Sequence, residues 1–127
     1  MVTSIEQSKK LIELGVDRKT SDMCYPKDAF SPHYEEPRCV RSLAGLALSA
    51  WSLDALLKLM PKSIDDGQVY TFSLLPTWDK TWCAVYGTDD YDVAHSVEEK
   101  EPLNAVYKML LWVIKNGYLK EEENDKN

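Results

Sequence analysis

Three residues in the first third of the chain have the chemistry of metal ligands. They are Cys24, His33 and Cys39, and a thiolate and imidazole set is the usual donor set of a zinc site. Their spacing contains no Cys-x-x-Cys pair, and a fourth ligand would have to come from elsewhere in the chain. We therefore interpret them as two isolated thiols and a surface imidazole, and we expect neither a metal nor a cofactor.

A second pair, Cys83 and His95, has the minimum composition for nucleophilic catalysis. Both lie in stretches that we predict to be strands, Cys83 on the face of Val85 and His95 on the face of Val93. Whether those faces coincide is not readable from the sequence. No glycine-rich turn, helix start or basic residue flanks Cys83 to lower its pKa, which favours an inert cysteine. We predict no enzymatic activity, and a small Cys/His-dependent hydrolase or transferase is the alternative.

Adjacent carboxylates recur along the chain. General acid and base catalysis needs two carboxylates in different environments, one of them in an apolar pocket. These pairs adjoin in sequence, so a solvated face is their default interpretation: Glu35 and Glu36, Asp65 and Asp66, Asp89 and Asp90, Glu98 and Glu99. The chain also lacks a glycine-rich phosphate loop and the common hydrolase, zinc-protease and calcium-loop motifs.

The strongest internal charge cluster runs from Asp89 to Glu101 and holds six acidic residues against Lys100 alone. Carboxylates along a strand and its turn imitate the charge of a phosphate backbone and attract a basic partner at long range. A charged edge strand that resists aggregation is the competing interpretation. We predict a partner-binding surface made of Asp89, Asp90, Tyr91, Asp92, Glu98, Glu99 and Glu101.

The elements that must position this surface are strands of the second half. Alternation of apolar and polar residues predicts three strands, over 69–75, 81–86 and 91–97. Short turns between them favour an antiparallel meander. One face of the last strand would carry Tyr91, Val93, His95 and Val97.

Helices are predicted both before and after the meander in the sequence. Ser4 and Gln7 have the spacing of a capping box, and Gly15 offers a left-handed stop, so a helix should run from Ile5 to Leu14. The other predicted helices cover 42–50, 52–60 and 102–116. Whether residues 43–60 form one helix or two stays open.

A long connection separates the first helix from the next. Pro26, Pro32 and Pro37 interrupt residues 16–41, and each removes a backbone donor. Three aromatic side chains in the stretch favour an irregular loop docked on the core. The predicted fold class is α+β: a single domain over 1–119, with a three-stranded antiparallel meander packed against three to four helices. Residues 120–127 are predicted to be a disordered acidic tail.

Composition limits the class of protein. A chain of 127 residues with 44% hydrophobic content fits one core. No stretch approaches the roughly 20 apolar residues of a membrane span, no signal peptide is evident, and three cysteines agree with a reducing compartment, so we expect a cytoplasmic protein without membrane contact. The net charge of -6 is confined to residues 63–127, which argues against direct nucleic-acid binding and favours a basic protein partner.

Two segments, Ala50–Pro61 and Pro102–Trp112, together with Asn116-Gly117-Tyr118, resemble segments of small uncharacterised proteins encoded by phages, prophages and mobile elements of gut bacteria. The similarity runs from the first helix to Tyr118. It implies an origin and carries no catalytic residues.

These observations predict a non-enzymatic protein-interaction module of a phage or mobile element. We expect an acidic inhibitor, of an anti-defence or anti-CRISPR-like kind, that covers the basic nucleic-acid-binding surface of a host protein. Besides the hydrolase or transferase named above, the other alternative is a phage structural or accessory protein that assembles with itself as a homo-oligomer.

Overall fold

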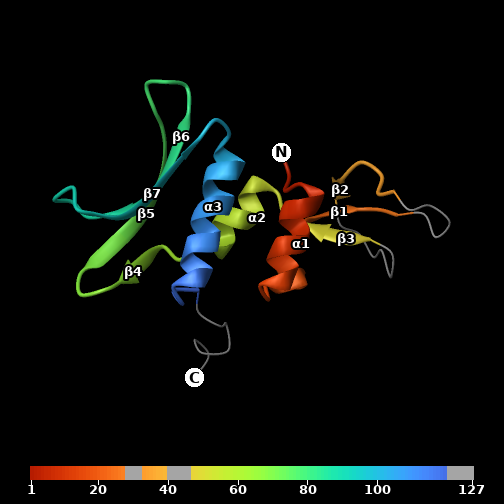
Figure 1. The fold of residues 1–127 in the computed structure, drawn as a ribbon, viewed down its shortest axis with the longest axis horizontal. Helices are drawn as coiled ribbons and strands as arrows, with labels where there is room; N and C mark the ends of the chain where they lie inside the picture. Colours follow the sequence, from red (N-terminus) through yellow and green to blue (C-terminus); the bar gives the residue numbers. More distant parts are fainter. Residues whose placement is uncertain (28–32, 40–46, 120–127) are drawn as a thin grey trace. The chain divides into compact units, whose positions relative to one another are not determined.

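The computed structural model describes residues 1–27, 33–39 and 47–119 (Figure 1). Contacts divide the chain into two compact units, Met1–Leu57 and Lys58–Asn127; the single domain expected over residues 1–119 stays a prediction. The first unit has a three-stranded antiparallel sheet and the second a four-stranded one. With three α-helices in the described ranges, the protein is a mixed α+β protein. The predicted tail at 120–127 lies outside those ranges.

The first helix, α1 (Ile5–Glu13), is held by local signals at both ends. At its start the Ser4 hydroxyl accepts the Gln7 N–H, and the Gln7 side chain accepts the Ser4 N–H, at 3.0 and 2.9 Å. At its end Gly15 adopts a φ of 92° and donates to the Ile12 carbonyl. The capping box and the glycine stop are therefore confirmed.

The sheet of the first unit corrects the prediction of a structureless loop at 16–41. It contains β1 (Met23–Tyr25), β2 (Arg38–Cys39) and β3 (Leu48–Ala50), in the order β2-β1-β3, and a short 3-10 helix η1 (Arg18–Thr20) precedes it. Strands of two or three residues are too short to show alternation, and Pro26 and Pro37 sit just outside them. Residues 28–32 and 40–41 of the predicted loop lie outside the described part of the chain.

The helix predicted over 42–50 is wrong where it can be checked, because Leu48–Ala50 is the strand β3; residues 42–46 lie outside the described ranges. Leucine and alanine favour a helix, but pairing with β1 overrides that preference. The helix α2 (Leu53–Leu59) follows separately. Ser52 caps it by accepting the Ala55 N–H at 3.2 Å.

The second unit has a four-stranded antiparallel sheet, where the sequence predicted three strands. Its strands are β4 (Ser63–Asp65), β5 (Val69–Pro76), β6 (Trp82–Gly87) and β7 (Val93–Glu99), paired in the order β4-β5-β6-β7. The helix α3 (Pro102–Lys115) then packs against β6 and β7. Figure 1 shows α3 in blue beside the green and cyan strands.

The helix α3 begins and ends as its sequence predicts. Pro102 occupies the first helical position, where its missing N–H costs nothing. Gly117 has a φ of 75° and donates to Ile114, and the Tyr118 N–H donates to Val113 at 2.9 Å. This is a Schellman ending, so the chain reverses and brings the Tyr118 ring to 5.4 Å from that of Trp112.

The strand register gives the sheet of the second unit two different faces. Tyr86 lies between Phe72 and His95, whereas the preceding residue, Val85, lies between Ser73 and Ser96. We call the first the helix face, because α3 packs on it: the Trp112 ring stacks on that of His95 at 4.7 Å and 2°. We call the second the open face.

A β-bulge corrects the predicted alternation of the last strand. The register of β6 against β7 shifts between Tyr86 and Gly87, so that Gly87 pairs with Val93, Tyr86 pairs with His95, and Ala94 is the extra residue. Val93 therefore belongs to the open face and His95 to the helix face, although the sequence predicted one face for both. An inserted residue changes the phase of a strand without changing its composition.

Candidate functional site

The proposed catalytic pair is not formed. Cys83 lies opposite Glu98 on the open face, whereas His95 lies opposite Tyr86 on the helix face. Partial burial and then the Glu98 carboxylate raise the pKa of Cys83, which keeps its thiol protonated near neutral pH and weakly nucleophilic. A Cys/His mechanism based on these two residues has no geometric support.

The candidate zinc ligands of the first unit are also separated. Cys24 pairs with Arg38, and its neighbour Met23 pairs with Cys39, so the two cysteines belong to opposite faces of their sheet. Burial raises the pKa of Cys24. In residues 1–27, 33–39 and 47–119 no three His, Cys, Asp or Glu side chains are grouped as a metal site would require.

The seven residues predicted as one partner-binding surface divide between the two ends of β7. Asp89, Asp90, Tyr91 and Asp92 form the β6–β7 turn, while Glu98, Glu99 and Glu101 lie at the other end of the strand. Six residues of extended chain place the two groups about 20 Å apart.

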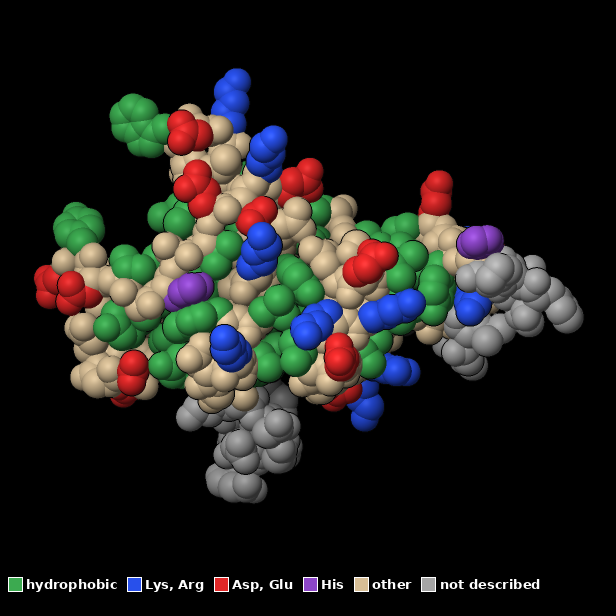
Figure 2. All heavy atoms as spheres, in the orientation of Figure 1, with side chains coloured by type: hydrophobic (Ala, Val, Ile, Leu, Met, Phe, Trp, Pro, Cys, Tyr) green, Lys and Arg blue, Asp and Glu red, His purple; other side chains and the backbone are tan. Residues whose placement is uncertain are grey.

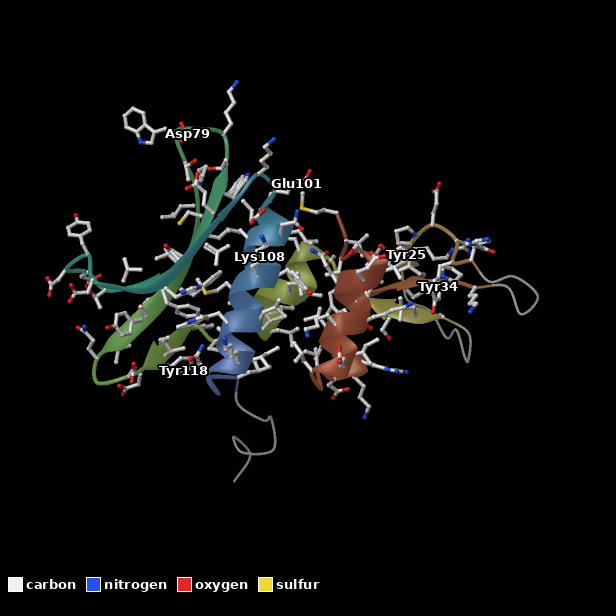
Figure 3. The ribbon with its side chains drawn as sticks, viewed as in Figure 1. Tyr25, Tyr34, Asp79, Glu101, Lys108 and Tyr118 are labelled. Carbon is white, nitrogen blue, oxygen red and sulfur yellow. The ribbon has the colours of Figure 1, made fainter. Side chains whose placement is uncertain are left out.

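The second of these groups is itself dispersed. Glu98 is on the open face and accepts a hydrogen bond from the Thr81 hydroxyl. Glu99 lies on the helix face, where Lys108 of α3 donates to it at 2.5 Å. Glu101 is the N-cap residue that immediately precedes α3 (Figure 3). The glutamates therefore have separate local partners or positions and do not form one patch.

The β6–β7 turn, by contrast, is a defined structure built around Thr88. The Thr88 hydroxyl accepts the N–H groups of Asp90 and Asp92 at 3.2 and 3.1 Å. The Thr88 N–H donates to the Asp92 carbonyl at 2.8 Å, and its carbonyl accepts the Tyr91 N–H at 3.1 Å. Four hydrogen bonds to one residue fix the positions from which the aspartates project.

Tyr91 is the most unusual residue of this turn. Its φ of 69° lies in the left-handed region, which costs a residue other than glycine about 1–2 kcal/mol. Its side chain is 92% exposed, so apolar burial within this chain does not offset the conformational cost. A turn held in this conformation presents a rigid aromatic ring outward among three carboxylates.

A second turn extends the acidic surface at this end of the sheet. The register Thr71 to Gly87 places the β4–β5 turn beside the β6–β7 turn. The Gln68 amide connects them, since it donates to the Asp92 carboxylate at 3.4 Å and to the Tyr70 hydroxyl at 3.0 Å. We name this combined surface the aspartate end and define it as Asp65, Asp66, Asp89, Asp90, Asp92 and Tyr91. All six side chains are exposed.

The β4–β5 turn is anchored as well. Gly67 has a φ of 91°, and the Asp66 N–H donates to the Gln68 carbonyl at 3.1 Å. Partial desolvation and then the neighbouring Asp66 carboxylate, which accepts a hydrogen bond from the phenol, raise the pKa of Tyr118. From the sequence, Asp65 and Asp66 were expected to be solvated turn residues only; the missed signal was the hairpin that β4 forms with β5.

Acidic side chains far outnumber basic ones along the strands and turns of this sheet. Residues 63–99 hold eight acidic side chains and Lys80 as their one basic side chain. Lys80 lies in the β5–β6 turn, next to Asp79 at the tip of the hairpin (Figure 3) and close to the fully exposed Trp78. In Figure 2 acidic side chains are seen at both turns of the aspartate end. A field of one sign attracts basic ligands within the Debye length of about 8 Å and beyond it at low salt.

Comparisons of the chain with protein-family models, curated proteins and solved structures give no match. The resemblance to phage and mobile-element proteins therefore stays a prediction. No helix in the described ranges combines the length and the apolar character that a membrane span requires.

Proposed function

We propose that this chain is a non-enzymatic protein-interaction module whose aspartate end binds a basic surface of a partner protein. The observation that carries the proposal is the pair of neighbouring turns that present five exposed carboxylates, three of them in the same turn as the exposed Tyr91. A basic surface that normally contacts nucleic acid is the type of partner that this charge complements. An inhibitor that occupies such a surface is the role we propose.

The chemistry of the surface assigns different tasks to its members. Exposed carboxylates at the rim of an interface mainly raise the association rate and select partners of opposite charge. An aromatic ring with few rotatable bonds contributes contact area at a small entropic cost, and tyrosine is enriched among residues that dominate binding energy. We therefore expect the aspartates to control the association rate and Tyr91 to control the dissociation rate.

The test uses a double variant, Asp89→Asn with Asp90→Asn, whose side chains make no hydrogen bond that the turn depends on. The matched control is Glu13→Gln with Glu36→Gln, which changes the net charge equally at exposed positions of the first unit. Each tagged protein is incubated with a bacterial lysate at 50 mM and 300 mM salt. Recovered proteins are identified by mass spectrometry.

The proposal expects the wild type and the control to retain a basic protein at low salt, with retention lost at high salt. The double variant should retain at least about tenfold less, because two of five carboxylates are removed. Equal capture by all three proteins, or no capture by folded wild type at low salt, would contradict it. Tyr91→Ala should then accelerate dissociation of the recovered partner with a smaller change in its association rate.

A further inference from the structure

We infer that the partner is bound through an extended basic segment, which adds to the outer edge of β7 as a fifth strand of the sheet. This inference rests on the proposed function and specifies the form in which the basic partner binds. It starts from the strand order β4-β5-β6-β7, which leaves β7 paired on one side only among the residues that the structure describes.

An edge strand is a template for another strand, since every second residue turns its N–H and C=O groups away from the sheet. Proteins usually block such an edge with proline, with lysine or with a very short strand. β7 is seven residues long and contains no proline or lysine between Val93 and Glu99. Its bulge at Ala94 lies near the start of the strand, so His95 to Glu99 keep a regular register against β6. The opposite edge of the sheet is less suited to pairing with another strand. It is formed by β4, which has only three residues, and by the part of β5 that β4 does not cover, which ends at Pro76.

The charge around β7 selects the occupant. Asp92 immediately precedes the strand and Glu98 lies near its end, about 20 Å away, while residues 93–97 between them contain no Asp, Glu, Lys or Arg. The one basic residue that adjoins the strand in the sequence is Lys100, which follows its last residue. A segment of about seven residues with lysine or arginine near both ends and small residues between them fits this pattern. A second copy of the chain fits less well, because each copy carries a net charge of -6.

The experiment measures binding of the full-length protein to the peptide Lys-Lys-Val-Thr-Val-Thr-Val-Lys-Lys at low salt. Two further peptides have the same sequence and charge but carry N-methyl groups on alternate amides, one on the odd positions and one on the even positions. A strand that pairs through one edge uses only one of the two sets of amides. We expect one methylated peptide to lose at least about tenfold in affinity and the other to bind like the parent.

Amide hydrogen exchange of β7 provides the second readout. Bound parent peptide should slow exchange of alternate amides between Val93 and Glu99 by at least about tenfold, and should leave the central amides of β6 unchanged. β6 is already paired on both sides.

Each contrary outcome points to a different failure. Equal binding by all three peptides, with no protection of β7, would overturn the inference and leave a charge-only interaction of the proposed kind. Failure of every peptide, while the lysate partner still depends on Asp89 and Asp90, also overturns it without affecting the proposed function. Protection of β7 that grows with protein concentration in the absence of peptide identifies a second copy as the occupant and overturns it as well.

Discussion

The two faces of the four-stranded sheet are made by the same strands and differ in almost every physical property. The helix face has Ala84 and Tyr86 fully buried and an aromatic cluster that continues through His95 and Trp112. The open face has exposed polar residues such as Thr71 and Ser96. Neighbouring residues along a strand therefore differ in burial, and the most buried side chains of this sheet, Ile64, Ala84 and Tyr86, lie on the helix face.

The largest expected effect comes from Tyr86→Ala. Removing a fully buried aromatic side chain leaves a cavity against Phe72 and Trp112, whose rings lie 5.3 and 6.2 Å from that of Tyr86. The free energy of unfolding should fall by about 3–5 kcal/mol, as measured by urea denaturation. The matched variant Val85→Ala, one residue away on the open face, should lose about 1 kcal/mol. Similar losses for both would remove the distinction between the faces.

Alkaline pH should reveal the burial of the same residue. Burial raises the pKa of Tyr86 well above its usual range, so the folded state holds a proton that the unfolded state releases near pH 10. The resulting stability is complete below about pH 10 and is lost as the pH rises toward the folded-state value.

Tyr86→Phe isolates this effect. At pH 7 it should cost about 1 kcal/mol, for the lost hydrogen bond from the Tyr86 hydroxyl to the Pro61 carbonyl. In urea titrations at increasing pH, the difference between wild type and variant should shrink above about pH 10. A difference that stays constant to pH 11 would show that the Tyr86 phenol ionises normally in the folded protein.

A smaller effect is expected from His95→Ala. Loss of the stacked contact with Trp112 should cost about 0.5–1.5 kcal/mol, and the near-ultraviolet circular dichroism of the tryptophan should change. Ser96→Ala, on the open face, should stay within about 0.5 kcal/mol of wild type and leave that spectrum unchanged. If Ser96→Ala were the more costly of the two, the bulge at Ala94 would be placed wrongly.

The smallest effect is expected for Cys83→Ser on the open face. The side chain is partly exposed and its thiol makes only a long contact of 3.9 Å to the Ala84 carbonyl, so the free energy of unfolding should change by no more than about 0.5 kcal/mol. In native protein, iodoacetamide should label Cys39, which is exposed, well before Cys24, which is buried. Faster labelling of Cys24 would contradict the burial of β1.

Local signals account for the parts of the fold that the sequence predicted well. The helices α1 and α3 have their caps within a few residues of their ends, and β5, β6 and β7 are long enough to alternate. The sheet of the first unit was missed because β1 is only three residues long and is a strand only through pairing with distant residues. Its Cys24, for example, pairs with Ser49, which lies 25 positions later in the chain. No local pattern records a pairing of that kind.

The candidate site was predictable to a similar extent. A turn after the second strand was predicted from Gly87 to Asp90, but Tyr91 and Asp92 were predicted as the start of the last strand and belong to the turn instead, because β7 begins at Val93. The contribution of Asp65 and Asp66 depends on β4, which is too short to be read as a strand, and on the Gln68 contact to Asp92. The dispersal of Glu98 and Glu99 to opposite faces follows from strand geometry once the register is known.

The order of strands in the two sheets has a consequence for the rate at which each can form. In β4-β5-β6-β7 every strand pairs with its neighbour in sequence, so each pairing closes only a short loop. In β2-β1-β3 the central strand β1 comes first in the chain, and its pairing partners lie up to 27 residues later, as in the pair of Met23 and Ala50. These pairings therefore close longer loops. Although the N-terminal unit is synthesised first, we expect the meander and α3 to reach native structure in fewer steps, because their contacts are the more local.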